Sequence, residues 1–314
     1  MFNYTKSLMD HVGHTFYAVD SNYRTIAQGW SRADGTGPLD LFSHRNPGYV
    51  FRTGDYTSDS VAIQTIIDEM VDFRADTLYF TPGAYSVATA LAINVPDARW
   101  LGPKCAHPSC AATSLANVGA LMYGITAAAD RMELGYLQLI PVTAQTMFDV
   151  AAVAGFYGHD LFINMDGVAA STATIPFVFA TTAEFVNFNR LYIWCDAGQG
   201  PAIQAAGIIK GLTVSNFEIY QEAGTWVTAF DLAGVGAAAT KFGPGYISGT
   251  GTAAVTTLVT VANKTVDDSN GFITGVRCST HGPAAGALGT LTTDVATLDI
   301  SDSWLAVVLD QAQP

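Results

Sequence analysis

The chain has 314 residues, of which 49% are hydrophobic and only 13% charged, and its formal net charge is −13. This acidic balance would repel phosphates, so we expect no nucleic-acid partner. Polar residues and glycines interrupt the longest apolar run, residues 111–129, and the first residues lack the pattern of an export signal. We therefore expect neither membrane insertion nor Sec export.

Residues 1–56 show little periodicity and carry turn signals at 33–38 and 46–48. They are rich in aromatic side chains: Phe16, Tyr17, Tyr23, Trp30 and Phe42. These aromatics need burial while the backbone offers few internal ladders, so we expect an irregular segment that is ordered by docking. The alternative is an extra capping layer on the domain that follows.

An amphipathic helix is predicted at about residues 58–73, at the start of a domain that spans 57–314. Its apolar residues recur on one helical face: Ile63, Ile66, Ile67 and Met70. Short strands are expected next at 78–80, 85–87 and 91–93, with a turn at Pro82-Gly83. A helix laid over the first strands would cover their open edge.

Several runs in this region together resemble the opening of pectate-lyase-like right-handed β-helices: Gly54 to Gln64, Leu78 to Tyr85, Leu91 to Ile93 and Leu101-Gly102. That opening is typical of phage tailspikes, head spikes and capsid-decorating proteins, and of polygalacturonase-like hydrolases. The resemblance implies the fold and its cap but no particular reaction, because these residues build the cap and the first turn. It also implies that residues 1–56 attach the chain to a virus particle.

Four cysteines are few for this length. Cys105, His107 and Cys110 lie close together in sequence, and Cys278 precedes His281. A structural zinc ion needs about four ligands, usually as two spaced pairs. We therefore expect free thiols in a reducing cytoplasm, with no metal and no cofactor.

From residue 185 onward a short apolar pattern recurs, with isoleucines at 193, 219, 247, 273 and 300. A second series, Ile203, Phe230 and Val259, keeps pace with it. The runs are too short for helices and are separated by Gly, Asn and Ser clusters, which predicts an all-β parallel β-helix, a solenoid. We expect roughly nine rungs between about residues 75 and 310, right-handed by the resemblance and by the general rule for parallel crossovers.

If the isoleucines point inward, their neighbours point outward. The expected outward aromatics are Tyr192, Trp194, Tyr220, Tyr246 and Phe272. An exposed apolar line of this kind marks an interface. A glycan-binding platform would need polar partners and carboxylates around the rings, whereas a subunit interface would need small apolar neighbours. The sequence around these residues is rich in Ala, Gly and Thr, which favours the subunit interface.

No catalytic residue is predicted. Glycoside hydrolysis commonly needs two carboxyl groups roughly 5 to 9.5 Å apart, and Glu218 and Asp299 are expected about 14 Å apart on stacked strands. Asp267-Asp268 precedes Ser269-Asn-Gly271, where turn chemistry explains it. The motifs of polygalacturonase-like enzymes are missing, although an active site between subunits stays open.

The sequence thus predicts a structural, non-enzymatic protein of a bacteriophage virion: a capsid decoration, a head spike or a short tail spike. We expect a homotrimer that binds other virion proteins through residues 1–56 and lies on the virion surface after synthesis in the host cytoplasm. A host surface glycan is a further possible partner. The alternative is a tailspike depolymerase, a hydrolase or lyase that cleaves a bacterial surface polysaccharide.

Overall fold

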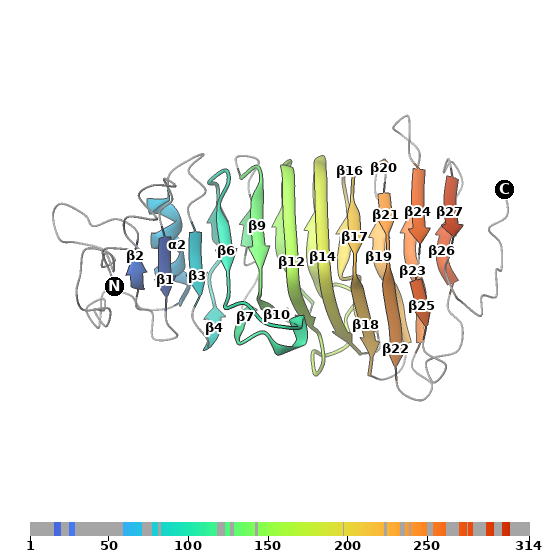
Figure 1. Cartoon of the computed structure of the whole chain (residues 1–314), viewed down its shortest axis with the longest axis horizontal. Helices are drawn as coiled ribbons and strands as arrows, with labels where there is room; N and C mark the ends of the chain where they lie inside the picture. Colours follow the sequence, from blue (N-terminus) through green and yellow to red (C-terminus); the bar gives the residue numbers. More distant parts are fainter. Residues whose placement is uncertain are drawn as a thin grey trace.

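The computed structural model describes residues 16–19, 25–28, 59–70, 77–80, 83–117, 123–125, 129–141, 144–196, 198–222, 225–232, 236–238, 240–249, 254–261, 270–274, 276–278, 287–291 and 297–301. The strands run across the long axis of the molecule and, beyond the first two strands of the chain, those of each face stack along it in chain order (Figure 1). Strands of successive coils pair in parallel. The fold is therefore an all-β parallel β-solenoid.

Each coil contributes strands to three faces. Face 1 contains β3 (Thr77–Phe80), β6 (Arg99–Leu101), β9 (Met132–Gly135), the first halves of β12 (Ala154–Asn164) and β14 (Ala183–Cys195), β17 (Thr213–Ser215), β21 (Thr240–Phe242), β24 (Asn270–Thr274) and β27 (Thr297–Ser301). Face 2 contains β4 (Gly83–Val87), β7 (Thr113–Asn117), β10 (Gln138–Ile140), the second halves of β12 and β14, β18 (Phe217–Gln221), β22 (Gly245–Gly249) and β25 (Val276–Cys278).

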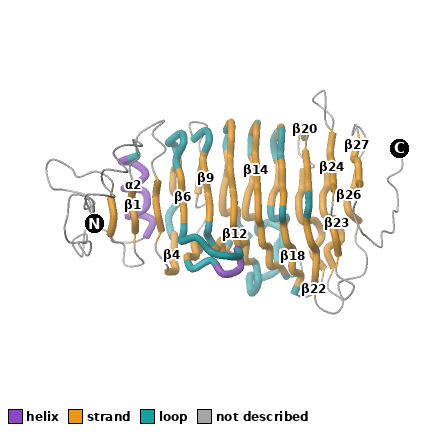
Figure 2. Tube along the Cα trace, viewed as in Figure 1, coloured by secondary structure: helices purple, strands orange, loops and turns teal. Residues whose placement is uncertain are grey.

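Face 3 is a separate sheet, which has eight strands in the part of the chain that the structure describes. They are β5 (Leu91–Ile93), β8 (Tyr123–Ile125), β11 (Thr146–Val150), β13 (Ile175–Phe179), β15 (Ile203–Ala205), β19 (Thr225–Leu232), β23 (Ala254–Val261) and β26 (Ala287–Leu291). The short strand β16 (Ile208–Lys210) pairs with the first residues of β14, and the short strand β20 (Gly236–Ala238) pairs with β16. Helical residues are confined, among those described, to α2 (Asp59–Glu69) and the short η1 (Pro108–Cys110), as Figure 2 shows.

The corners beside face 1 are sharp because single residues there adopt left-handed backbone conformations. Tyr136, Asp160, Arg190 and Asn216 have φ between 52° and 59° and separate face 1 from face 2. At the other edge of face 1 the equivalent residues are Asp97, Arg131, Gly155, Phe185 and Gly211. A left-handed residue other than Gly, Asn or Asp costs roughly 1 to 2 kcal/mol, so burial of the flanking strands has to offset this cost.

The predicted isoleucine series is confirmed for three of its five members. Ile193, Ile219 and Ile247 stand opposite one another on face 2 and are buried. Ile273 instead pairs with Phe242 and Ile300 on face 1, while Cys278 continues the column below Ile247. The prediction was therefore wrong for Ile273 and Ile300. An aromatic residue followed by Ile occurs on both face 1 and face 2, so the repeat period alone does not distinguish the two faces. The second series, Ile203, Phe230 and Val259, stacks on face 3 as predicted.

Helix α2 lies where a helix was expected, although it is shorter than 58–73. Ile63, Ile67 and Met70 are buried against the first coil. The Ser60 hydroxyl accepts hydrogen bonds from the backbone N–H groups of residues 88 and 89, at 2.8 and 3.1 Å. Gln64 bonds the backbone of Ala92 on β5. The helix is thus fixed to the corner between faces 2 and 3.

Two strands of the N-terminal segment belong to the same sheet as the solenoid. β1 (Phe16–Val19) pairs in parallel with β3, and β2 (Thr25–Gln28) pairs antiparallel with β1. Phe16 and Tyr17 lie on β1, whereas the predicted attachment residues Tyr23, Trp30 and Phe42 lie outside the described residues. This part of residues 1–56 therefore adds a layer to the end of the solenoid.

A cluster of phenylalanines fills the middle of the core. Phe188 packs against Phe156, Phe177 and Phe179, with ring centroids 5.1 to 6.4 Å apart. All four rings are buried, and they come from faces 1 and 3. The cluster therefore joins the two sheets across the interior of the solenoid.

We expect Phe188→Ala to lower the free energy of unfolding by about 3 to 5 kcal/mol, because it leaves a cavity in a close-packed interior. The matched control is Phe185→Ala on the same strand, where the side chain is 72% exposed. This control should change stability by less than about 0.5 kcal/mol. Urea unfolding followed by fluorescence measures both, and equal effects of the two variants would contradict the register of β14.

Candidate functional site

The outward side chains of face 2 bring most of the predicted aromatics together. Tyr192, Glu218 and Tyr246 occupy equivalent positions on three successive strands, and Trp194 stands beside Tyr220 in the same way. The Trp194 and Tyr220 rings meet edge to face with centroids 5.6 Å apart. We call Tyr192, Trp194, Tyr220 and Tyr246 the aromatic ridge.

Phe272 does not belong to the aromatic ridge. It stands opposite Lys241 and Asp299 on face 1, whereas the face 2 neighbour of Tyr246 is Arg277. The same register places Glu218 and Asp299 on different faces. These two residues therefore do not occupy stacked positions on one face.

Polar groups surround the aromatic ridge. Trp194 donates from its indole N–H to Glu222 at 3.2 Å. The Glu218 side chain lies between Tyr192 and Tyr246 and is 47% exposed. Burial and the nearby charge of Glu218 raise the pKa of the Tyr192 hydroxyl, so this group stays a neutral donor at neutral pH. The ridge is thus an amphipathic surface and not a purely apolar one.

Residues 103–112, which connect β6 to β7, form a crossing loop that lies over face 2. The loop includes η1, which touches β12 and β14. Strands stack at roughly 4.8 Å, so β14 lies about 14 Å beyond β7, and five extended residues reach about 17 Å. The loop is therefore long enough to bring His107 to β14, from which its side chain reaches Glu218 on the next strand, β18.

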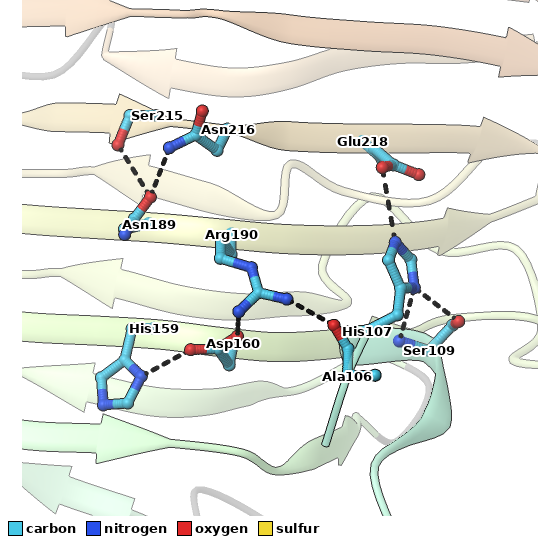
Figure 3. A network of polar contacts seen from close by, with 10 residues as sticks. All are labelled: Ala106, His107, Ser109, His159, Asp160, Asn189, Arg190, Ser215, Asn216 and Glu218. Carbon is cyan, nitrogen blue, oxygen red and sulfur yellow. Dashed lines mark hydrogen bonds and ion pairs between the residues drawn. The ribbon is translucent and has the colours of Figure 1, made fainter. Parts of the chain in front are cut away.

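Three contacts hold the crossing loop in place, and Figure 3 draws the two polar ones. Arg190 donates to the Ala106 carbonyl at 2.7 Å. The His107 ring meets the Tyr192 ring edge to face at 5.4 Å. His107 Nε2 also lies 3.4 Å from a Glu218 carboxylate oxygen.

A cavity of about 340 Å³ opens between the crossing loop and the strands. Its walls are formed by His107, Pro108, Arg190, Leu191, Asn216 and Glu218. It adjoins the aromatic ridge through Glu218, whose neighbours on the adjacent strands are Tyr192 and Tyr246. The cavity wall thus carries one carboxylate, one guanidinium, one imidazole and one amide, beside Pro108 and Leu191.

A chain of paired charges connects Arg190 of the cavity wall to Glu133 on face 1. Glu133 contacts Arg99 at 2.5 Å and His159 Nε2 at 3.0 Å. His159 Nδ1 lies 2.9 Å from Asp160, which pairs with Arg190. The His159 and Asp160 side chains are only 8% and 7% exposed. Arg190 thus joins this buried network to both the cavity and the crossing loop.

The buried network shifts two pKa values in opposite directions. Burial acts to raise the pKa of Glu133, but hydrogen bonds and charge from His159 and Arg99 outweigh it and lower this pKa to about 2. Burial acts to lower the pKa of His159, but bonds to Glu133 and Asp160 outweigh it and raise this pKa. Gly135 makes room for the imidazole, since a Cβ at that position would overlap the His159 ring.

Neither a metal site nor a membrane-spanning helix is found in the part of the chain that the structure describes. No group of three or more His, Cys, Asp or Glu side chains there is placed to hold a metal ion. Cys105 and Cys110 are free thiols, half-buried and exposed respectively. No helix in the described ranges is long and apolar enough to cross a membrane.

The sequence analysis missed the cavity because its walls come from distant segments. His107 and Glu218 are separated by 111 residues, and only the crossing loop brings them together. The one local signal was the Cys105-Ala-His107-Pro-Ser-Cys110 segment, which was considered for zinc. In the structure the contact partner of His107 is Glu218 from β18.

We expect the unfolding free energy gained from the network to be greatest between pH 4.5 and 6.5, the ordinary pKa values of Glu133 and His159. It falls at lower pH, as Glu133 approaches its lowered folded pKa. It also falls at higher pH, as His159 loses its proton through its raised folded pKa. His159→Gln should therefore lower the free energy of unfolding near pH 5.5 and lower it less at alkaline pH. Urea unfolding across pH measures this difference, and a constant offset at every pH would contradict a charged His159.

Comparison with models of protein families and with curated proteins finds no match for this chain. Among solved structures, the ORF18 protein of Geobacillus virus E2 aligns over 78% of this chain and 59% of its own length, with a TM-score of 0.35 and 11% identity. The A-module of the mannuronan C-5 epimerase AlgE6 of Azotobacter vinelandii aligns over 79% and 95%, with a TM-score of 0.25 and 13% identity. The catalytic domain of a GH87 α-1,3-glucanase aligns over 83% and 66%, with a TM-score of 0.23 and 10% identity. All three scores lie below 0.5, so no functional argument rests on these likenesses.

Proposed function

We propose that this chain is a spike-like structural protein whose β-solenoid binds a glycan on face 2. The observation that carries the proposal is the aromatic ridge beside a polar cavity. Sugar rings present apolar C–H faces and hydroxyl edges, so they suit aromatic rings flanked by carboxylates, amides and cations. Glu218, Glu222, His107 and Arg190 supply those polar groups at the ridge.

The same surroundings argue against a subunit interface at the ridge. The sequence criterion for an interface was small apolar neighbours. The crossing loop and the neighbouring coils surround the ridge with charged and hydrogen-bonding side chains instead. Burying several such charges between subunits would cost desolvation energy unless each found a partner.

Glycosidic cleavage by a pair of carboxylates is less well supported than binding. Among the six residues that form the cavity wall, Glu218 alone carries a carboxylate. A hydrolase of the usual type needs a second one roughly 5 to 9.5 Å away. We therefore prefer a glycan-binding spike to the depolymerase.

The finer features of this proposal come from the sequence resemblance. We propose a right-handed solenoid capped by α2, presented on the surface of a bacteriophage virion as a head spike, capsid decoration or short tail spike. The particle would be contacted by residues 1–56. Three copies would associate side by side, since the low charge of the chain favours self-association away from the ridge.

Glycan binding is tested with Tyr246→Ala, which removes a ridge side chain that is 42% exposed. We expect a tenfold or greater loss of affinity for extracted bacterial surface polysaccharide, equivalent to about 1.4 kcal/mol. Phe185→Ala removes an exposed aromatic residue away from face 2 and should leave affinity unchanged. Isothermal titration calorimetry measures both, and equal affinities of wild type and Tyr246→Ala would overturn the assignment of the ridge.

Assembly and attachment are tested together by light scattering and by mixing the purified chain with particles that lack it. We expect a trimer at micromolar concentration and saturable binding to the particles. Tyr246→Glu should change neither result, because the ridge faces a glycan and not another subunit. Dissociation of the trimer by Tyr246→Glu would show that the ridge is a subunit interface. Failure of the unmodified chain to bind the particles would contradict the virion assignment.

A further inference from the structure

His107 and Glu218 of the cavity wall form, together with the neighbouring Ser109, a line from a hydroxyl to a carboxylate. The Ser109 hydroxyl lies 2.7 Å from His107 Nδ1, and His107 Nε2 lies 3.4 Å from Glu218 Oε1 (Figure 3). The serine and the histidine come from the crossing loop, and the glutamate comes from β18. A hydroxyl, an imidazole and a carboxylate in this order are the parts of an activated nucleophile.

The hydrogen bonds also fix the tautomer of His107. The backbone N–H of Ser109 donates to His107 Nδ1 at 3.3 Å. A backbone N–H can only donate, so Nδ1 of the neutral ring carries a lone pair and Nε2 carries the proton. Nδ1 is then the shared acceptor for the backbone N–H and the hydroxyl of Ser109, while Nε2–H points to Glu218.

The contact between Nε2 and Glu218 is longer than the usual 2.7 to 3.2 Å of an N–H···O bond. Catalytic hydrogen bonds are often long in the absence of substrate and shorten when it binds. Glu218 is therefore a positioning residue, which orients the ring and stabilises the imidazolium that forms during reaction. Ser109 is exposed and adjoins the cavity through Pro108.

We propose that Ser109, His107 and Glu218 hydrolyse an acyl ester, and that the substrate class is an O-acylated glycan bound at the cavity. The substrate class rests on the proposed glycan-binding function, whereas the ester chemistry rests on the three side chains alone. Pro108 supplies the apolar part of the cavity wall, which suits a short acyl group such as acetyl. Arg190 on the same wall uses two donors for Asp160 and Ala106, and a guanidinium has five.

The reaction consumes one water and needs no other reactant. Ser109 Oγ attacks the ester carbonyl carbon while its proton passes to His107 Nδ1, which leaves a tetrahedral oxyanion. The carbon–oxygen bond to the sugar breaks, and His107 returns the proton to the departing sugar hydroxyl. Water then attacks the acyl-serine with His107 as base, which releases the carboxylic acid and restores Ser109.

A purely structural role would explain part of this geometry. The bond from the Ser109 N–H to His107 Nδ1 caps η1. Capping does not require the Ser109 hydroxyl, nor does it require Glu218. A structural role therefore predicts a change in stability without any acyl transfer.

The test measures hydrolysis of p-nitrophenyl acetate, a small ester that needs no glycan binding. We expect wild type to hydrolyse it above the uncatalysed rate and Ser109→Ala to lose about a hundredfold or more of that activity. His107→Ala should lose about 10²-fold as well. The matched control is Ser248→Ala on β22 of the same face, which should keep the wild-type rate.

Two further measurements separate catalysis from structure. Glu218→Gln should lower kcat at unchanged KM and an unchanged thermal midpoint, as expected for a positioning residue. A fluorophosphonate probe should label Ser109 in wild type and not in His107→Ala, as identified by peptide mass spectrometry. No hydrolysis by wild type, or a rate and a label that survive Ser109→Ala, would overturn the proposal.

The ester-hydrolysis test and the glycan-binding test can fail independently of each other. Ester hydrolysis without polysaccharide affinity would keep the three-residue chemistry and overturn the glycan-binding function. Affinity without hydrolysis would do the reverse. Release of acetate from an O-acetylated bacterial polysaccharide, measured on wild type and Ser109→Ala, then tests the substrate class.

Discussion

The surface that we assign to function depends on the parallel register between β14 and β18. This register sets Tyr192 opposite Glu218 and Trp194 opposite Tyr220. Side chains alternate along a strand, so a slip of one residue would turn the whole ridge into the core. The inward column of Ile193, Ile219 and Ile247 prevents such a slip, because these buried side chains cannot exchange places with charged ones.

Arg190 couples three levels of the structure in one residue. Its backbone makes the left-handed corner between faces 1 and 2, its guanidinium pairs with buried Asp160, and it also holds the Ala106 carbonyl. The contacts of the Arg190 side chain with the charge network and with the crossing loop therefore hold its backbone in the strained corner. Residues in unfavourable backbone conformations persist where the surroundings determine them strongly, and often at functional sites.

The sequence predicted the solenoid, its face 3 series and the helix before the first coil, because each depends on local periodicity. It did not predict the corners at Arg131, Tyr136 and Arg190, since left-handed bends are expected at Gly, Asn or Asp. It also joined Ile273 and Phe272 to the wrong face, because both faces carry the same pattern. In the sequence, the residues beside those of the ridge are rich in Ala, Gly and Thr, which suggested apolar surroundings. In the structure, the ridge side chains contact residues of other coils and of residues 103–112.

The crossing loop has a consequence for how the molecule unfolds. In a solenoid each coil touches mainly the coils before and after it, so stability is close to a sum of local terms and the ends can fray independently. His107 reaches from the connection before β7 to β18, past β10, β12 and β14. The His107–Glu218 contact links all the coils that it spans, so we expect these coils to unfold together as a single cooperative unit. Amide hydrogen exchange would then show one common protection level from β10 to β18, instead of a gradient along the axis.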